Sequence, residues 1–372
     1  MVTPGGRRQP GTVRAMVVKE VRQLRRDRRT LAMMVFLPLL LIVVFGYAAT
    51  FNVSRIPTTV VGQGAVQSAR LLPAPFHANR VDPTGGRSEA VRAVRDGYSS
   101  VALIAGPDRP VLLLDGTSVF TAETALRAAA GPAFARAGLG TPTTEVLFNP
   151  GLRTSYVMVP GLAGMIVLFI GTVVTSLGVV RERQSGTLEQ LAVMPLRPAD
   201  VFVGKVAPYF LVGALDMLLV IGAGLVLFGV PFTGSVATFV LGALLFLFVA
   251  LGTGVLISSV SQNQGQAIQL AIMTLLPQII LSGLIFPLSS MAAGVRWIGY
   301  ILPLTYFVEI ARAVMLRGAP IGSLWLPFAY LGGASVVIVG LATLRFSRTL
   351  SPATRRWRWR LGRRAPAGEA VG

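Results

Sequence analysis

Long runs of apolar residues organise this chain. Each of six runs contains at most one charged residue, and each is close to the ~20 residues that a helix needs to cross the hydrocarbon of a bilayer. The runs are Leu31–Ala49, Tyr156–Val180, Val206–Val230, Phe232–Val260, Ala267–Leu288 and Ile321–Leu344. A soluble helix of this length would carry a polar stripe, and these runs do not. The pattern predicts an α-helical polytopic membrane protein with six transmembrane helices.

The segment between the first two runs, residues 51–153, has a different pattern. Short β-rich stretches bounded by Pro, Gly and Asp alternate there with helical stretches, which predicts an inserted small α/β domain. The expected strands are Thr58–Val61, Ser99–Ile104 and Val111–Leu114, and the expected helices are Ser88–Asp96 and Thr121–Ala137, with Ser88 and Thr121 as N-caps.

The remaining segments divide in the same way. We expect an amphipathic N-terminal helix in residues 1–30, because Val13, Val17, Val21 and Leu24 share one helical face. The other segments are transmembrane helix 1 at 31–50, transmembrane helices 2–6 at 154–346, a loop at 181–205, a re-entrant segment at 289–320 and a basic tail at 347–372.

The basic residues flank the apolar runs. Nine precede the first run and eight follow the last. Basic residues beside a span hold that end in the cytoplasm, and an even number of spans places both termini on one side. We therefore expect cytoplasmic termini, a cytoplasmic 181–205 loop, and external 51–153 and 289–320 segments. A cleaved signal peptide is the alternative for the first run, but its basic leader is long and no clear cleavage site follows.

Charge and composition change the picture only slightly. The net charge of +19 is explained by these membrane flanks, which attract anionic membrane lipids, so no nucleic-acid partner is predicted. The near-exclusive use of arginine over lysine suggests a GC-rich bacterial genome, and with the apolar runs we expect a multi-pass protein of the bacterial cytoplasmic membrane. The chain has no cysteine and a single histidine, His77, so we expect no metal site.

The loop at 181–205 has a helix of its own. Gly186 ends the helix that continues from the second span, and Thr187 with Gln190 forms a capping box. Leu188 and Leu191 then share one face, which suits docking to a partner. These residues alone fit a plain interhelical loop equally well.

Three charged residues in or near apolar sequence are candidates for the translocation route or a subunit interface. Asp216 lies near the middle of the third run, where a carboxylate is costly. Protonation or a polar partner at an interface would also explain it. Glu309 and Arg312 are three positions apart and could pair across one helical turn.

A nucleotide-binding P-loop is absent from the sequence. That motif needs Gly-x-x-x-x-Gly-Lys-Ser/Thr, and neither lysine of the chain, Lys19 or Lys205, fits it. Energy for transport must therefore come from a partner or from an ion gradient.

Several motifs together resemble the permeases of type-2 ABC exporters. The run from Arg181 to Leu191, with Pro195, Pro198 and Gly204-Lys205 after it, is similar to their cytoplasmic loop. Further matching motifs are Lys19-Glu20 with Arg26-Asp27-Arg28-Arg29, Asp115-Gly116-Thr117 with Ala122 and Ala125, Ser282-Gly283 through Phe286-Pro287, and Ile298, Tyr300, Pro303, Thr305-Tyr306-Phe307, Arg312 and Arg317-Gly318. The large external domain resembles the subgroup that exports drugs, lipopeptides or lipids. Met194 departs from the small polar residue common in the family.

The resemblance implies a transport subunit that is not itself an enzyme. It would form the translocation path with a second permease copy or paralogue, and a dimer of cytoplasmic ABC ATPase subunits would bind ATP and Mg²⁺. Helix Thr187–Val193 would be the coupling helix. The residues implied in ATPase coupling are Arg181, Glu182, Gly186, Thr187, Leu188, Glu189, Gln190 and Leu191, and those implied in the N-terminal docking helix are Lys19, Glu20, Arg26 and Asp27.

Other function classes fit the residues less well. An ion-driven secondary transporter usually has internal repeats and several intramembrane ionisable groups, and the sequence shows no repeat and one such group. A membrane enzyme would need paired carboxylates or a metal cluster at a membrane face. A structural or signalling membrane protein remains the other alternative.

Overall fold

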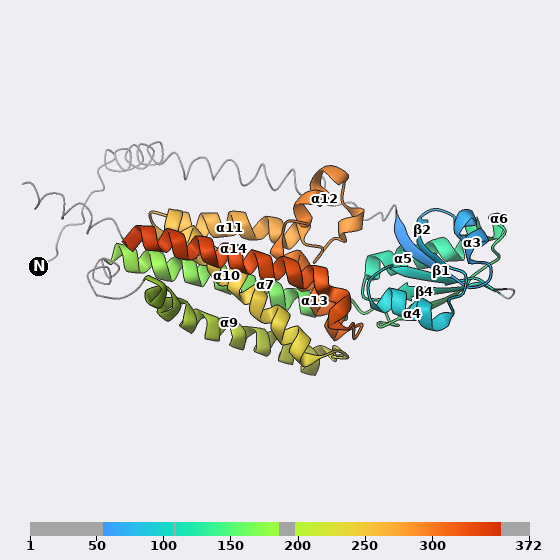
Figure 1. The fold of residues 1–372 in the computed structure, drawn as a ribbon, viewed down its shortest axis with the longest axis horizontal. Coiled ribbons are helices and arrows are strands. Elements are labelled where there is room, and N and C mark those ends of the chain that lie inside the picture. The colour runs from blue at the N-terminus through green and yellow to red at the C-terminus, as the bar shows by residue number, and fades with distance from the viewer. Residues whose placement is uncertain (1–54, 107–108, 186–197, 351–372) are drawn as a thin grey trace, which may run out of the picture. The chain divides into compact units, whose positions relative to one another are not determined.

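The structure is a computed structural model that describes residues 55–106, 109–185 and 198–350 (Figure 1). The chain divides into two compact units, residues 1–46 and 47–372, and all described residues belong to the second. The predicted N-terminal helix, the first span, the coupling helix Thr187–Val193 and the basic tail from residue 351 lie outside the described residues.

The inserted domain is built on a five-stranded mixed sheet. Its strand order is β2-β1-β3-β4-β5, and only the β3–β4 pair is antiparallel. The strands are β1 (Ile56–Val61), β2 (Phe76–Asp82), β3 (Val101–Ile104), β4 (Val111–Asp115) and β5 (Thr143–Leu147).

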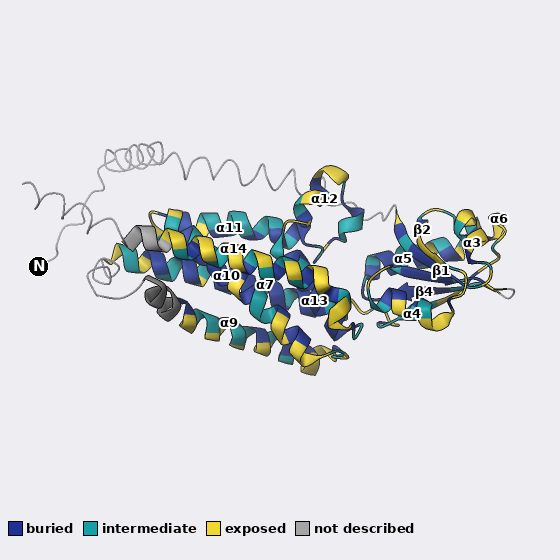
Figure 2. Cartoon of the chain, in the orientation of Figure 1, coloured by how far each residue is buried: buried dark blue, intermediate teal, exposed yellow. Residues whose placement is uncertain are grey.

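Helices cover both faces of this sheet, because side chains alternate between the faces along each strand. Leu112 and Leu114 pack on one side, in a cluster that includes residues of α5 (Val119–Ala130) and α6 (Ala133–Arg136). Leu113 packs on the other side, against α4 (Arg87–Arg95). The central strands are therefore apolar on both faces, and Figure 2 shows them buried. Helix α3 (Ala65–Leu71) completes the domain.

The predicted strands and the helix near Ser88–Asp96 are confirmed, but the predicted caps are wrong. Helix α4 follows Gly86 and α5 follows Ser118, so that Ser88 and Thr121 lie inside the helices. The single helix expected over Thr121–Ala137 is two helices. It breaks at Gly131 because the residue before a proline, here Pro132, avoids helical angles.

Among the described residues, five helices are long and apolar enough to cross a membrane, and they coincide with the second to sixth apolar runs. They are α7 (Thr154–Gln184), α9 (Pro198–Phe228), α10 (Val236–Val260), α11 (Gln264–Leu281) and α14 (Trp325–Leu350). Short 3₁₀ turns at Leu288–Ser290 and Ile321–Leu324 precede α12 and α14 respectively. Outward-facing apolar residues such as Leu211, Val226 and Val336 are more than two-thirds exposed. Such exposure is expected where the surface contacts lipid or another protein chain and not water.

Small residues bring α7 and α10 into close contact. A Cβ atom added at Gly254 of α10 would lie 2.8 Å from the Thr172 carbonyl oxygen and 2.9 Å from that of Gly171. In a membrane, burial of apolar surface does not drive helices together. Van der Waals packing at such close backbone contacts therefore supplies much of the free energy of helix association.

The region predicted as re-entrant is a bent pair of helices. Helix α12 (Ala293–Gly299) and α13 (Pro303–Met315) meet at 75°, which fits either a broken span or a re-entrant loop. Gly299 packs at this bend, where an added Cβ would lie 2.6 Å from the Leu281 carbonyl oxygen. The bend brings the end of α11 beside the start of α13.

Candidate functional site

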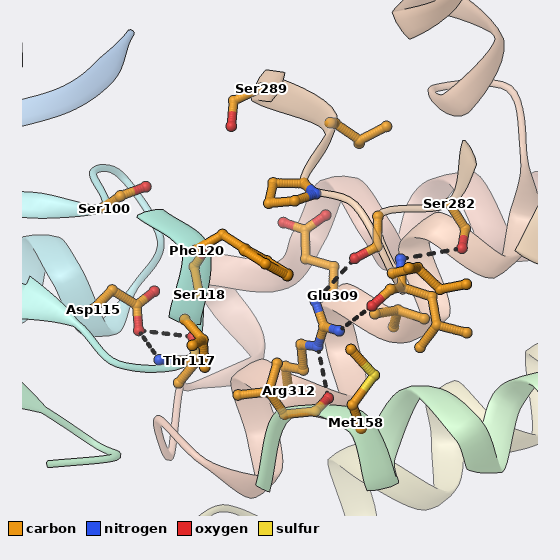
Figure 3. A pocket seen from close by; sticks show the side chains of 18 of the residues that line it. Ser100, Asp115, Thr117, Ser118, Phe120, Met158, Ser282, Ser289, Glu309 and Arg312 are labelled. Carbon is orange, nitrogen blue, oxygen red and sulfur yellow. Dashed lines mark hydrogen bonds between the residues drawn. The ribbon is translucent and has the colours of Figure 1, made fainter. Parts of the chain in front are cut away.

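A cavity of about 410 Å³ lies where the β4–α5 turn of the inserted domain approaches α7, α13 and the segment after α11 (Figure 3). Its wall is partly apolar, with Phe120, Met158 and Leu284, and partly polar, with serine and threonine hydroxyls. Two of the three candidate residues from the sequence, Glu309 and Arg312, line it.

Arg312 joins three segments of the chain. Its Nε donates to the Val157 carbonyl at 3.0 Å, Nη1 to the Gly283 carbonyl at 3.1 Å and Nη2 to the Leu284 carbonyl at 3.0 Å. The predicted pairing of Arg312 with Glu309 is wrong, because the guanidinium points to these backbone carbonyls instead (Figure 3). A planar fork of donors suits this task, and a lysine could not reproduce it.

The Asp115-Gly116-Thr117 motif forms a tight turn at the end of β4. The Asp115 Oδ1 accepts from the Thr117 amide at 2.9 Å and from the Thr117 hydroxyl at 2.7 Å. Only glycine fits at position 116 without a steric clash, since an added Cβ would lie 2.7 Å from the Leu147 carbonyl oxygen and 2.8 Å from that of Asn149. The side-chain amide of Asn149 donates to the Gly116 carbonyl, which fixes the turn.

The other carboxylate oxygen of Asp115 meets Arg317, just beyond α13. The Arg317 Nη1 lies 3.4 Å from Asp115 Oδ2, with only 10% and 6% of the two side chains exposed. The Arg317 Nε is buried without an acceptor. In the sequence, both residues stand out only as parts of the Asp115-Gly116-Thr117 and Arg317-Gly318 motifs. With 202 positions between them, no spacing in the sequence indicates that they pair.

Glu309 is exposed within the cavity and has no hydrogen-bond or ion-pair partner among the described residues. Its side chain projects into the space between Phe120 and the segment that contains Ser289 (Figure 3). The neighbouring arginines are already engaged, Arg312 by carbonyls and Arg317 by Asp115. Glu309 is therefore the accessible charge of this cavity.

Asp216 lies apart from this cavity, on α9. Its side chain is half-buried, and its Oδ2 is buried without a hydrogen-bond partner. Part of α9 borders a second cavity of about 620 Å³, which is lined by apolar side chains including Met217 and Phe239. The structure does not bring Asp216 together with Glu309 and Arg312.

The far end of α7 leads into the predicted coupling loop. Arg183 Nη1 donates to the Ser261 carbonyl at 2.9 Å, and the side-chain amide nitrogen of Gln264 donates to the side-chain oxygen of Gln184 at 3.1 Å. Asn263 caps α11 by accepting from the Gln266 amide. The entry to the loop is thus fixed to the turn between α10 and α11. Arg181 and Glu182 lie on this last turn of α7.

The other predicted coupling and docking residues lie outside the described part of the chain. They are Gly186, Thr187, Leu188, Glu189, Gln190 and Leu191 of the loop, and Lys19, Glu20, Arg26 and Asp27 of the N-terminal segment. Within the described part, no group of three or more His, Cys, Asp or Glu residues could hold a metal ion.

Comparison with known proteins gives consistent results. The sequence model of the "ABC-2 family transporter protein" family matches residues 28–344. The chain is 30% identical over 370 residues to the "Probable multidrug ABC transporter permease YbhS" of Escherichia coli, which covers 91% of this chain and 97% of that protein.

Two further relatives match parts of the chain. The E. coli "Probable multidrug ABC transporter permease YbhR" is 34% identical over 178 residues, 48% of each chain. The E. coli "Inner membrane transport permease YhhJ" is 34% identical over 214 residues, 56% of each chain. The apolar helices of the structure agree with a multi-pass membrane protein. With a family match over most of its length and a relative of nearly equal extent, this chain belongs to the ABC-2 family of ABC transporter permeases.

Proposed function

We propose that this chain forms, with a second permease, the translocation path of an exporter that is driven by ATP hydrolysis on separate nucleotide-binding subunits. Family membership supports the permease role, and the lack of a P-loop anywhere in the sequence supports the division of labour. ATP and Mg²⁺ then act on the partner ATPase.

The observation that carries this proposal is the anchoring of α7 at its far end. Arg183 and Gln184 fasten the start of the 181–205 loop to the α10–α11 turn. A docked ATPase that moved the loop would move α7 and α11 with it, and Arg312 ties both helices to α13 at the other end.

The proposed topology follows from the basic flanks. Both termini and the 181–205 loop face the cytoplasm, and the inserted domain lies outside. The substrate is drug-like, a lipid or a lipopeptide. Support comes from the names of the YbhS and YbhR relatives, both called multidrug transporters, and from the apolar cavities between the helices.

Reconstitution tests the proposal. The permease is co-expressed and co-purified with a candidate ABC ATPase and placed in proteoliposomes, and ATP hydrolysis and transport of a lipophilic dye are measured together. We expect a stable complex and transport that needs ATP. Transport by the permease alone under an imposed ion gradient would support an ion-driven secondary transporter instead.

A further inference from the structure

The cavity between the inserted domain and α13 has the properties of a ligand site. Its volume of about 410 Å³ is within the range of small-molecule pockets. Phe120, Met158, Leu284 and Val308 give it an apolar wall, and hydroxyl groups such as that of Ser289 are scattered at its edge. Such a wall would hold an amphiphile of moderate size.

The charges around the cavity leave one group unpaired. Five charged side chains line it, and four have partners. Arg312 is held by three carbonyls, Asp115 and Arg317 pair with each other, and Glu123 pairs with Arg127 at 3.3 Å. The carbonyls do not neutralise Arg312, but they hold its guanidinium, so Glu309 is the one of these five side chains whose charged atoms have no direct partner among the described residues.

We propose that this cavity binds lipophilic cations, with Glu309 as the counter-charge that selects them. An unpaired carboxylate beside apolar walls attracts a cation more strongly than it would in open water, because the local dielectric constant is lower. Phe120, which Figure 3 shows reaching toward Glu309, adds aromatic surface to the apolar wall of the cavity.

This inference rests on the proposed export function, since it names a substrate class for the proposed translocation path. An anionic or neutral amphiphile would gain the apolar contacts but would leave Glu309 unpaired. The selectivity is therefore by charge, with shape and apolar area common to all candidate ligands.

Two probes of nearly equal size and shape test the charge selectivity. Tetraphenylphosphonium is a lipophilic cation, and tetraphenylborate is its anionic counterpart. Binding of each is measured by equilibrium dialysis on the purified full-length permease in detergent, without ATP or ATPase, against empty micelles. We expect saturable binding of the cation and none of the anion beyond micelle partitioning.

Glu309→Gln keeps the shape of the side chain and removes its charge. It should weaken binding of the cation by about tenfold or more, since an ion pair near a protein surface is strong at an effective dielectric constant of ~20. Glu309→Arg should abolish cation binding and allow the anion to bind. Glu145→Gln is the matched control, because this carboxylate pairs with Arg87 in the inserted domain and does not line the cavity. It should bind as the unmodified protein does.

Equal binding of both probes, no saturable binding of either, or full cation binding by Glu309→Gln would each overturn the inference. Each variant is first checked by size-exclusion chromatography and thermal unfolding, so that loss of fold is not read as loss of binding. Since the assay uses the permease alone, it can fail while ATP-driven export holds, or succeed while association with the ATPase fails.

Discussion

The carboxylate of Asp115 and the guanidinium of Arg317 meet at 3.4 Å although 202 positions separate them in the chain. Asp115 ends β4 of the inserted domain, and Arg317 follows α13. Both side chains are at least nine-tenths buried. This pair is therefore a direct electrostatic contact between the inserted domain and the helical part of the chain.

Removing one partner of this pair should be strongly destabilising. Arg317→Met leaves the Asp115 carboxylate buried without its cation, and breaking a buried pair in this way costs about 3–5 kcal/mol. Thermal unfolding in detergent should show a clear drop in the melting temperature. Adding Asp115→Asn to Arg317→Met should recover part of the loss, because the uncompensated charge is then gone.

An exposed ion pair of the same domain provides the comparison. Arg127 and Glu123 pair at 3.3 Å, but the side chain of Arg127 is 83% exposed. Arg127→Met should change stability by less than about 1 kcal/mol, as is usual for surface pairs. If Arg317→Met proved equally mild, the contact would not be holding the two parts together.

Leu188→Asp should uncouple the permease from its ATPase. In the predicted coupling helix Thr187–Val193, Leu188 and Leu191 share the face that would dock, and a charge placed in an apolar groove costs several kcal/mol unless it is paired. We expect ATPase stimulation and transport to fall at least about tenfold, while membrane insertion stays normal. Measurements are ATP hydrolysis in proteoliposomes and the membrane abundance of the variant.

Glu189→Arg tests the same predicted helix by reversing the charge at the neighbouring position, and it should have a similar effect. The control is Thr84→Ala, an exposed position in the inserted domain. Normal ATPase stimulation and transport by both loop variants would remove the 181–205 loop from the coupling role.

The membrane helices could be predicted from the sequence because their signal is long and uniform. Each apolar run is longer than the ~10–14 residues typical of a buried core helix, and the five described spans fall where the pattern put them. The strands β2 and β5 could not be found in this way. Both lie at the edges of the sheet, where side chains are largely exposed and the apolar alternation that identifies a strand is lost.

The cavity was only partly predictable, for a different reason. Glu309 and Arg312 stood out as charges in apolar sequence. The partners of Arg312, however, are backbone carbonyls 155, 29 and 28 positions away, and a carbonyl has no signature in the sequence. Pairing by spacing along one helix therefore gave the wrong partner, and only the fold could supply the right ones.

Two glycine-to-alanine changes should have opposite effects on stability. Gly254→Ala places a Cβ 2.8 Å from the Thr172 carbonyl oxygen, which forces α7 and α10 apart. Gly340→Ala, on α14, meets nothing within 4 Å and should stabilise its helix by up to ~1 kcal/mol, because alanine is the better helix former. Thermal unfolding of the two variants in one detergent checks this. Equal behaviour would show that the α7–α10 contact is loose.

Cysteines introduced at Ser88 and Ser185 should report opposite sides of the membrane. The chain contains no cysteine, so each variant carries a single label site, and both positions are exposed. A membrane-impermeant maleimide should label Ser88→Cys in spheroplasts, which lack the outer envelope. It should label Ser185→Cys only after permeabilisation. The reverse result would contradict the topology inferred from the basic flanks.

Asp216 should be replaceable by asparagine but not by leucine. Its Oδ2 is buried without a hydrogen-bond partner, and no ion pair to it is found among the described residues. A charge within a membrane span is costly, so we expect a polar packing role for Asp216 at an interface. An amide can accept and donate hydrogen bonds much as a protonated carboxyl does, whereas leucine cannot.

Asp216→Asn should therefore assemble and transport within about twofold of the unmodified chain, and Asp216→Leu should lose permease pairing, as measured by cross-linking in membranes. Failure of both variants would establish a need for charge, and normal behaviour of both would show that α9 tolerates any residue here.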